Sequence, residues 1–245
     1  MSVNKQMLID PRNKLLAALP CAEYERLVPH LHLVPLANRQ VIYEVGEAIA
    51  YVYFPNRAII SLLTMMNDGS TVEIALVGDE GMAGIPVILG DNISSIQAIV
   101  QVPGDGMRIN ADVLKTEFDR GGYLQSLLLR YVQAVLMELS QGVACNSRHT
   151  LEKRFARWLL KVSDRIGSQE FPLTQEFMAQ MLGVRRSGVT VAAGIFSQSG
   201  IIKYHRGHIT ILDREALEAT SCECYRIVKD EFTRLLGNLS VRKHT

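Results

Sequence analysis

Two adjacent arginines and a serine, Arg185, Arg186 and Ser187, open a run of residues with helical spacing just after a glycine-containing turn. In a helix-turn-helix, the start of the second helix points into the major groove of DNA. A guanidinium group can bind O6 and N7 of guanine together, which contributes about 1–3 kcal/mol of discrimination between bases. Thr190, one helical turn further on, can reach a base edge or a thymine methyl group. These residues predict sequence-specific binding to double-stranded DNA.

Two short helices joined by a tight turn must position these side chains. Thr174 suits the N-cap of the first helix, and Gly183 suits the left-handed conformation at its end. The small residue Ala179 lies four positions before this glycine, where the helices approach each other. The second helix is predicted from Arg185 to Gln198 and is ended by Gly200.

A β-hairpin with a basic tip is predicted directly after the second helix. Apolar residues at 201–202 and 209–212 flank the tip sequence His-Arg-Gly-His at 205–208. A hairpin in this place is a wing, and basic side chains at its tip can contact phosphates. We expect Lys203, His205 and Arg206 to contact the DNA, together with Thr174 at the start of the first helix.

The charge distribution supports this interpretation, although the net charge of the chain is only +1. Residues 148–212 hold 10 Lys/Arg against 4 Asp/Glu, whereas residues 1–147 hold 10 against 15 and residues 213–245 hold 6 against 6. The excess of positive charge is therefore confined to the segment with the predicted helices and wing, as expected of a module that binds a polyanion.

The N-terminal half has a different character. Short β-rich runs are separated by Gly, Asn and Asp turn signals, among them Pro103-Gly104-Asp105-Gly106, and this pattern is typical of an all-β roll or barrel. The β-rich runs are residues 51–54, 58–66, 71–77 and 95–102. Short helices interrupted by Pro20 are expected at 13–30. We expect residues 1–120 to form a sensory β-roll domain.

A long helix is predicted next, because residues 123–144 contain no proline and only one glycine. Apolar residues alternate at spacings of four and three, as in a coiled-coil seam. The seam residues are Leu128, Val132, Val135, Leu139 and Gly142. A second apolar face lies beside this seam, and a helix that is apolar on two sides needs two covers. We expect residues 121–147 to form a dimerisation helix covered by the β-roll and a second copy; the alternative is a buried helix of a monomer.

The chain resembles the Crp/Fnr family of bacterial transcription regulators. The resemblance is carried by LTQEFMAQMLGVRRSGVTVAA at 173–193 and SGIIKYHRGHITILD at 199–213, and it extends over nearly the whole length. It implies an α+β fold with an N-terminal, jelly-roll-like β-roll, a long dimerisation helix and a C-terminal winged helix-turn-helix at 148–245. It further implies a homodimer on a near-palindromic operator, with RNA polymerase as a partner.

The resemblance implies that Arg186 reads a base edge. At two other base-reading positions the sequence departs from the family. Ser187 stands where an acidic residue is usual, and Val191 stands where a basic residue is usual. Both departures imply an operator that differs from the best-known sequence of the family.

The predicted sensor lacks the residues expected for a cyclic nucleotide. Family members that bind one hold its phosphate with an arginine, in a stretch similar to residues 78–97. Here no Lys or Arg occurs at 58–107, and the phosphate arginine is replaced at about Ser94 or Ser95. A buried phosphate without a cation is strongly disfavoured. We expect an effector other than cyclic AMP; the alternative is a cyclic-nucleotide-responsive regulator or binding module with a non-standard pocket.

Two other groups could bind an anion in the predicted sensor. Backbone amides at a helix start near residues 82–84 can hold one in principle, but Asp79 and Glu80 stand directly before them and would repel it. Arg130 on the long helix could reach in from elsewhere, and it would have to offset the same negative field.

No metal or cofactor is expected. Only Cys21 lies in the N-terminal part, where iron–sulfur members of the family carry a cluster of cysteines. Cys222 and Cys224 are placed in the last helical region, where residues two apart do not face each other, and they are interpreted as structural or incidental thiols. Together with Cys21 and Cys145 they are expected to be free thiols in a reducing cytosol. His30 and His32 are assigned to packing rather than to haem ligation.

Enzymatic function is not expected, because the chain has no G-x-S-x-G, G-x-x-x-x-G-K-[ST] or H-E-x-x-H motif and its histidines are scattered. The first residues lack the apolar segment of a signal peptide, and no apolar run approaches the ~18 residues of a membrane span. We expect a cytoplasmic protein that does not interact with membranes.

Overall fold

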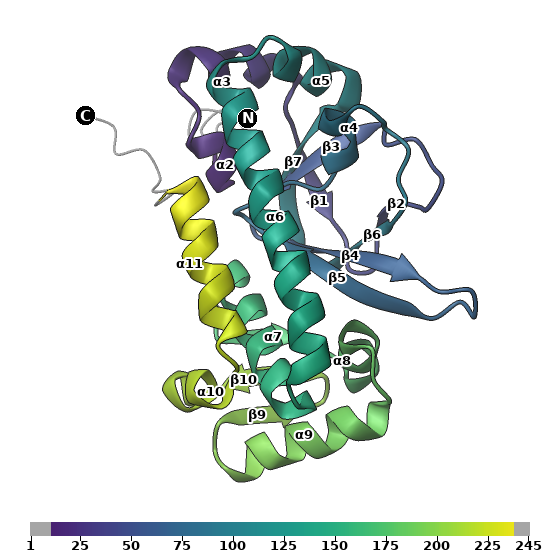
Figure 1. Cartoon of the computed structure of the whole chain (residues 1–245), viewed down its shortest axis with the longest axis vertical. Coiled ribbons are helices and arrows are strands. Elements are labelled where there is room, and N and C mark those ends of the chain that lie inside the picture. Colours follow the sequence, from purple (N-terminus) through teal and green to yellow (C-terminus); the bar gives the residue numbers. More distant parts are fainter. Residues whose placement is uncertain (1–10, 238–245) are drawn as a thin grey trace.

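The computed structural model describes residues 11–237 of the chain. Strands dominate its N-terminal part and helices its C-terminal part, and one long helix runs along both (Figure 1). This mixture of helices and strands confirms the predicted α+β fold class.

Two antiparallel sheets form the N-terminal β-roll. The first has the order β1-β7-β3 and the second the order β2-β6-β4-β5. The first sheet consists of β1 (His32–Leu36), β7 (Gly104–Asn110) and β3 (Tyr51–Pro55). The second consists of β2 (Val41–Tyr43), β6 (Gln97–Val102), β4 (Ile59–Met65) and β5 (Thr71–Val77). Side chains such as Phe54, Val100 and Met107 from the two sheets share one buried core.

The predicted turn at Pro103-Gly104-Asp105-Gly106 is wrong, because Gly104 and Gly106 belong to the central strand β7. A Cβ atom on Gly104 would lie 2.9 Å from the backbone nitrogen of Ala58, and one on Gly106 would lie 2.9 Å from the carbonyl oxygen of Phe54. The glycines therefore permit close approach of neighbouring backbones rather than a turn.

Short helices close the ends of the roll. They are α2 (Lys14–Ala17), α3 (Cys21–Leu27), the 3₁₀ helix η1 (Val28–His30), α4 (Ile85–Leu89) and α5 (Ala111–Asp119). Pro20 is the N-cap of α3, so the predicted interruption at this proline is confirmed. The buried side chain of Asn13 caps α2 and donates to the carbonyl oxygens of Pro55 and Gly81, both at 2.9 Å. It thereby fixes α2 to the roll.

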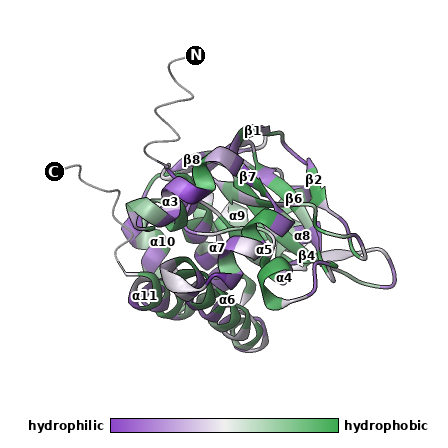
Figure 2. Ribbon diagram, turned by 90° about the horizontal axis from the view of Figure 1, so that it is seen from above, coloured by the Kyte–Doolittle hydropathy of each residue, from purple (hydrophilic) through white to green (hydrophobic). Residues whose placement is uncertain are grey.

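The long helix α6 (Gly122–Arg148) lies beside the last helix, α11 (Cys224–Leu236), in both Figures 1 and 2. The ribbon of each alternates between hydrophobic and hydrophilic residues (Figure 2). Leu235 and Leu236 of α11 are buried in the same core as the β-roll. The last helix, which the sequence placed with the winged helix-turn-helix, therefore packs on α6 and the N-terminal part.

The structure buries the predicted dimer seam within the chain itself. Leu128, Val132 and Val135 are buried in the N-terminal core, and Leu139 and Gly142 are half-buried. The side chains of Leu128, Val132 and Val135 are consequently not available to a partner. The exposed large apolar side chains of α6 lie on a different face of the helix. They are Tyr123, Leu129, Leu136 and Val143.

The C-terminal part contains four helices and a small sheet around a second core. The helices are α7 (Leu151–Ile166), α8 (Gln175–Leu182), α9 (Arg186–Gln198) and α10 (Arg214–Thr220). The sheet has the order β8-β10-β9 and consists of β8 (Glu170–Pro172), β10 (His208–Ile211) and β9 (Ile202–His205). Across residues 11–237, no helix combines the length and the hydropathy that crossing a membrane requires.

Candidate nucleic-acid interface

The helices α8 and α9 form the predicted helix-turn-helix. The hydroxyl oxygen of Thr174 accepts a hydrogen bond from the amide of Phe177 at 3.2 Å, as expected of an N-cap. Gly183 adopts a φ of 63°, and the amide of Val184 donates to the carbonyl oxygen of Ala179 at 3.0 Å. Helix α9 begins one residue later than predicted, because Arg185 is its extended N-cap.

Packing against α7 fixes the second helix and explains Gly188, a glycine inside a helix. A Cβ atom on Gly188 would lie 3.0 Å from Cδ2 of Leu151, so the glycine lets α9 approach the start of α7. Further along, the rings of Phe155 and Phe196 stack with their centroids 5.5 Å apart. Val189 is fully buried in the same core. These contacts set which face of α9 points outward.

The outward face of α9 carries the predicted DNA-contacting residues. Arg185, Arg186 and Thr190 are exposed, and Ser187 lies beside them in the first turn. Nε of Arg186 lies 4.0 Å from a carboxylate oxygen of Glu176, and both side chains are more than half exposed. An exposed ion pair of this length is weak, so the guanidinium group can exchange Glu176 for a base edge at little cost.

The predicted wing is the hairpin of β9 and β10. Arg206 and Gly207 form its two-residue turn, with φ values of 48° and 79°, as in a type I′ hairpin. Lys203, His205 and Arg206 are exposed. The amide of Leu173 donates to the carbonyl oxygen of Gly207 at 2.6 Å, which holds the wing tip beside the start of α8. This backbone hydrogen bond therefore joins the wing to the helix-turn-helix.

Of the two serines at the position of the family's phosphate arginine, Ser94 is used within the chain and Ser95 is exposed. Ser94 is buried, and its hydroxyl group donates to the carbonyl oxygen of Ile96 at 2.6 Å. The amide of Ala83, one of those that could hold an anion in principle, donates instead to the carbonyl oxygen of Tyr53 at 2.8 Å. Arg130, the candidate cation on the long helix, donates to the carbonyl oxygen of its helical neighbour Ser126 at 3.3 Å.

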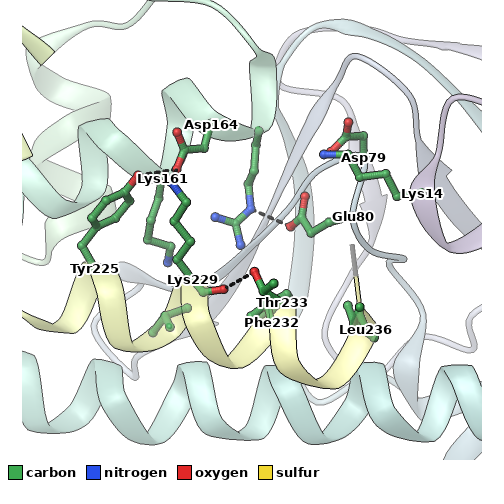
Figure 3. Close-up of a pocket in the computed structure, with 13 residues that line it drawn as sticks. Lys14, Asp79, Glu80, Lys161, Asp164, Tyr225, Lys229, Phe232, Thr233 and Leu236 are labelled. Atoms are coloured by element: carbon green, nitrogen blue, oxygen red, sulfur yellow. Dashed lines mark hydrogen bonds and ion pairs between the residues drawn. The ribbon is translucent and has the colours of Figure 1, made fainter. Parts of the chain in front are cut away.

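Asp79 and Glu80, expected to create an unbalanced negative field, are instead paired with cations from elsewhere in the chain. Nζ of Lys14 lies 2.9 Å from Asp79, and Nε of Arg165 in α7 lies 2.7 Å from Glu80. Burial and the neighbouring Glu80 raise the pKa of Asp79. Both pairs line a cavity of about 490 Å³. Figure 3 shows Lys14, Asp79 and Glu80 at its wall. The opposite wall is formed by α11, including Tyr225.

A buried ion-pair network joins three parts of the chain beneath this cavity. Glu138 of α6 pairs with Lys161 of α7 and lies 3.4 Å from Nη2 of Arg165, which also binds Glu80 of the β-roll. Burial alone would raise the pKa of Glu138, but the charges of Lys161 and Arg165 outweigh it and lower that pKa. The network thus couples the roll and the long helix to the helix that supports α9.

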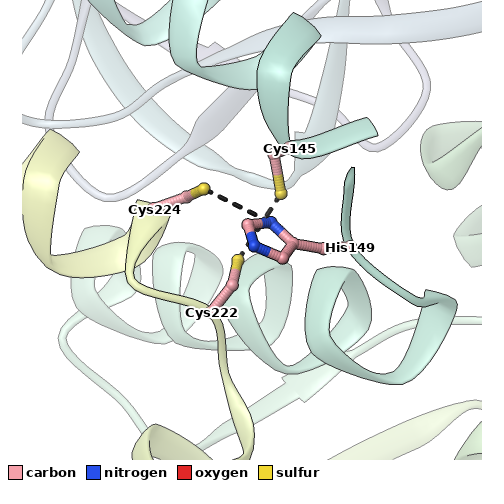
Figure 4. Close-up of side chains that lie close together, drawn as sticks. All are labelled: Cys145, His149, Cys222 and Cys224. Carbon is pink, nitrogen blue, oxygen red and sulfur yellow. Dashed lines mark hydrogen bonds between the residues drawn. The ribbon is translucent and has the colours of Figure 1, made fainter. Parts of the chain in front are cut away.

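A cluster of thiols and one imidazole was not predicted. The ligand atoms of Cys145, His149, Cys222 and Cys224 lie within 4.8 Å of one another (Figure 4). The interpretation of Cys222 and Cys224 as helical residues that face apart is wrong, because Cys222 precedes α11 and only Cys224 lies in it. The available sequence signal was the spacing of four between Cys145 and His149, which places both on one side of a helix end.

Comparison with known proteins agrees with this geometry. Residues 153–220 match the sequence model of the Crp-like helix-turn-helix domain. A CRP-like cAMP-activated global transcriptional regulator of Mycobacterium tuberculosis is 25% identical over 200 residues, which cover 78% of this chain and 88% of that protein.

Solved structures share the fold of most of the chain. A putative transcriptional regulator of the Crp/Fnr family from Eubacterium rectale superposes with a TM-score of 0.66 at 20% identity, covering 84% of this chain and 96% of that one. FixK2 from Bradyrhizobium japonicum superposes with a TM-score of 0.68 at 16% identity, covering 78% and 98%. The predicted resemblance to the Crp/Fnr family is thus confirmed: residues 153–220 match the Crp-like helix-turn-helix domain, and the described chain has the fold of proteins of this family.

Proposed function

We propose that this protein is a transcription regulator of the Crp/Fnr family, that it binds double-stranded DNA as a homodimer, and that Arg186 at the start of α9 reads a base edge in the major groove. The observation that carries the proposal is the exposure of the adjacent Arg185 and Arg186 at the N-terminus of a helix whose other face is buried. Positive charges at a helix N-terminus are disfavoured by the helix dipole. An anionic neighbour such as DNA removes that disadvantage.

The wing supplies contacts that do not depend on base sequence. Lys203, His205 and Arg206 are exposed on the hairpin, and Thr174 lies beside its tip. Basic side chains in such positions contact phosphates, and they fix the orientation of the recognition helix on the duplex. We assign base reading to α9 and backbone positioning to the wing.

A second copy of the chain is the proposed cover for the exposed face of α6. Leu129, Leu136 and Val143 recur at intervals of seven residues and are 47%, 60% and 70% exposed. This is the repeat of a coiled-coil seam. The polar residues Gln133 and Ser140 lie between these three apolar residues on the same face of α6. A homodimer through this seam presents two α9 helices and requires a near-palindromic operator.

The proposed effector is not cyclic AMP, although the Mycobacterium tuberculosis relative is described as cAMP-activated. Residues 58–107 supply no cation. Two cations that reach this segment from elsewhere, Lys14 and Arg165, pair with Asp79 and Glu80. The second candidate is a cyclic-nucleotide-responsive regulator with a non-standard pocket. The observation that favours it is the cavity of about 490 Å³ beside these ion pairs. By resemblance, RNA polymerase is the proposed partner of the DNA-bound dimer.

Selection of binding sites from random duplex DNA tests this proposal, because the method does not require a known operator. The full-length protein should enrich a near-palindrome with half-site centres about one helical turn, ~34–36 Å, apart. Enrichment of a sequence without two-fold symmetry would contradict the dimer, and the absence of any enriched sequence would contradict specific binding. Titration of cyclic AMP in the same assay separates the two effector candidates.

A further inference from the structure

Three thiols and one imidazole meet where the long helix, the DNA-binding part and the last helix come together. Cys145 lies in the last turn of α6 and His149 is the C-cap of that helix. Cys222 lies between α10 and α11, and Cys224 is the first residue of α11. Figure 4 shows all four side chains pointing toward one centre. Residues far apart in sequence have therefore been brought together by the fold.

Two distances within this cluster match those around a single tetrahedral metal ion. With Zn–S of about 2.3 Å and Zn–N of about 2.0–2.1 Å, tetrahedral sulfur and nitrogen ligands lie about 3.5–3.8 Å apart. Sγ of Cys145 lies 3.5 Å from Sγ of Cys222, and Sγ of Cys224 lies 3.5 Å from Nδ1 of His149. All four ligand atoms lie within 4.8 Å of one another, so small side-chain shifts bring them around one ion. An iron–sulfur cluster holds its cysteines around several metal atoms and spaces them further apart. A disulfide needs about 2.05 Å between sulfur atoms.

The surroundings orient these ligands. Nε2 of His149 lies 3.3 Å from a carboxylate oxygen of Glu223, which leaves Nδ1 directed at the sulfur of Cys224. A carboxylate on the second nitrogen of a ligating histidine fixes its tautomer and raises its basicity. Nε2 of Gln141 donates to the sulfur of Cys224 at 3.1 Å. Hydrogen bonds of this kind stabilise a thiolate.

A buried cation lies beside the cluster. Arg157 of α7 is buried, and its Nε has no hydrogen-bond partner among the residues that the structure describes. Its guanidinium group is close enough to interact electrostatically with Cys145 and Cys222. A divalent ion held by three thiolates and a neutral imidazole has a net charge of −1. Such a site would supply the counter-charge that the buried guanidinium group requires.

We propose that Cys145, Cys222, Cys224 and Nδ1 of His149 bind one Zn²⁺ ion in a closed tetrahedral site. On binding, each of the three thiols forms a bond from sulfur to zinc and releases its proton to solvent. The ion replaces no protein contact except the weak sulfur–sulfur and sulfur–nitrogen hydrogen bonds of the cluster. This inference concerns a structural site and does not depend on the proposed DNA binding.

The zinc site connects α11 to the junction between α6 and α7. Cys145 and His149 flank the end of α6, directly before α7 begins at Leu151. Cys222 and Cys224 belong to the segment that leads into α11. Bound zinc therefore restricts the angle between α6 and α7 and keeps α11 on α6. Loss of the ion should loosen both contacts.

Metal content and cobalt spectroscopy of the full-length chain test the site. Protein purified with Zn²⁺ and without chelator should contain one zinc ion per chain by elemental analysis. Protein loaded with Co²⁺ in place of zinc should show thiolate-to-cobalt charge transfer and the intense d–d bands of tetrahedral cobalt. Both signals should be lost in Cys222→Ser and kept in the matched control Cys21→Ser, because Cys21 is an exposed cysteine outside the cluster.

Glu223→Gln provides a second variant that keeps all four ligands. Loss of the carboxylate behind His149 should raise the dissociation constant for zinc about 10–100-fold in competition with a chelator. This measurement remains decisive if Cys222→Ser fails to fold. An unchanged dissociation constant would contradict the assigned role of His149.

Other outcomes overturn the proposal. Wild-type protein that binds neither Zn²⁺ nor Co²⁺ stoichiometrically has no such site. A disulfide between Cys145 and Cys222 in protein prepared with excess zinc, found by mass spectrometry without reductant, would assign the cluster to redox chemistry instead. An iron–sulfur chromophore in anaerobically purified protein would assign it to a larger cluster.

Discussion

Nε1 of Trp158 in α7 donates a hydrogen bond to Oε1 of Glu73 in β5 over 2.8 Å. This bond links the C-terminal part to the β-roll through a buried carboxyl group. Burial raises the pKa of Glu73 to about 7, although Lys161 and the hydrogen bonds act in the opposite direction. The hydroxyl group of Ser61 lies between Glu73 and an acceptor oxygen of Gln101 and has only one proton to donate. A protonated Glu73 can donate a hydrogen bond to the Ser61 hydroxyl group, which leaves Ser61 free to donate its own proton to Gln101.

The stability of the chain should therefore fall as pH rises between 4.5 and about 7, the ordinary and the raised pKa of Glu73. In this window the unfolded chain has released the Glu73 proton while the folded chain still holds it, so ionisation favours unfolding. Below the window the contribution of Glu73 is fully present. Glu73→Gln cannot ionise and should flatten the pH dependence of the unfolding free energy, measured in urea. Equal slopes in wild type and variant would show that Glu73 is ionised in the folded state.

Removal of Glu138 should destabilise the chain strongly. Glu138→Ala leaves Lys161 buried without its ion-pair partner and takes one partner from Arg165. An uncompensated buried charge costs about 3–5 kcal/mol. Asp119→Ala is the matched control, since it breaks an exposed pair with Lys115 and should change stability by less than about 1 kcal/mol. Similar unfolding free energies for the two variants would mean that the network does not hold the parts together.

Substitution of Leu136 should separate the proposed dimer. Leu136→Glu places a charge in the exposed seam of α6 and should give folded monomers in light scattering. Leu212→Glu is the control, because Leu212 is similarly exposed but lies after β10. Val135→Glu should instead unfold the chain, since Val135 is buried in the chain's own core. A dimer that survives Leu136→Glu would place the interface elsewhere.

Cyclic AMP should neither bind tightly nor alter DNA binding. Residues 58–107 contain no Lys or Arg to meet its phosphate. Calorimetric titration should show no saturable binding at micromolar concentration, and operator affinity should be unchanged by the nucleotide. Saturable binding together with tighter operator binding would show that a cation such as Lys14 or Arg165 leaves its carboxylate to hold the phosphate.

The helix-turn-helix of α8 and α9 could be predicted from local sequence signals. The features that could not be predicted depend on tertiary packing between distant segments. Thr174 and Gly183 mark helix ends by their own conformational preferences, so α8 and α9 were placed within a residue. Gly104 and Gly106 look like turn residues, but the backbones that approach them come from distant segments. The choice between the apolar faces of α6 depended on where α11 packs, and no local pattern indicates that.

The binding of Arg186→Ala to the selected operator tests the central proposal most directly. Fluorescence anisotropy should show a loss of about 1–3 kcal/mol, and preference should relax at one base position in each half-site. Lys203→Ala should instead weaken binding to all sequences alike, and Arg226→Ala, which removes an exposed arginine of α11, should leave binding unchanged. Full affinity and undiminished base preference in Arg186→Ala would contradict the assignment of α9 as the recognition helix.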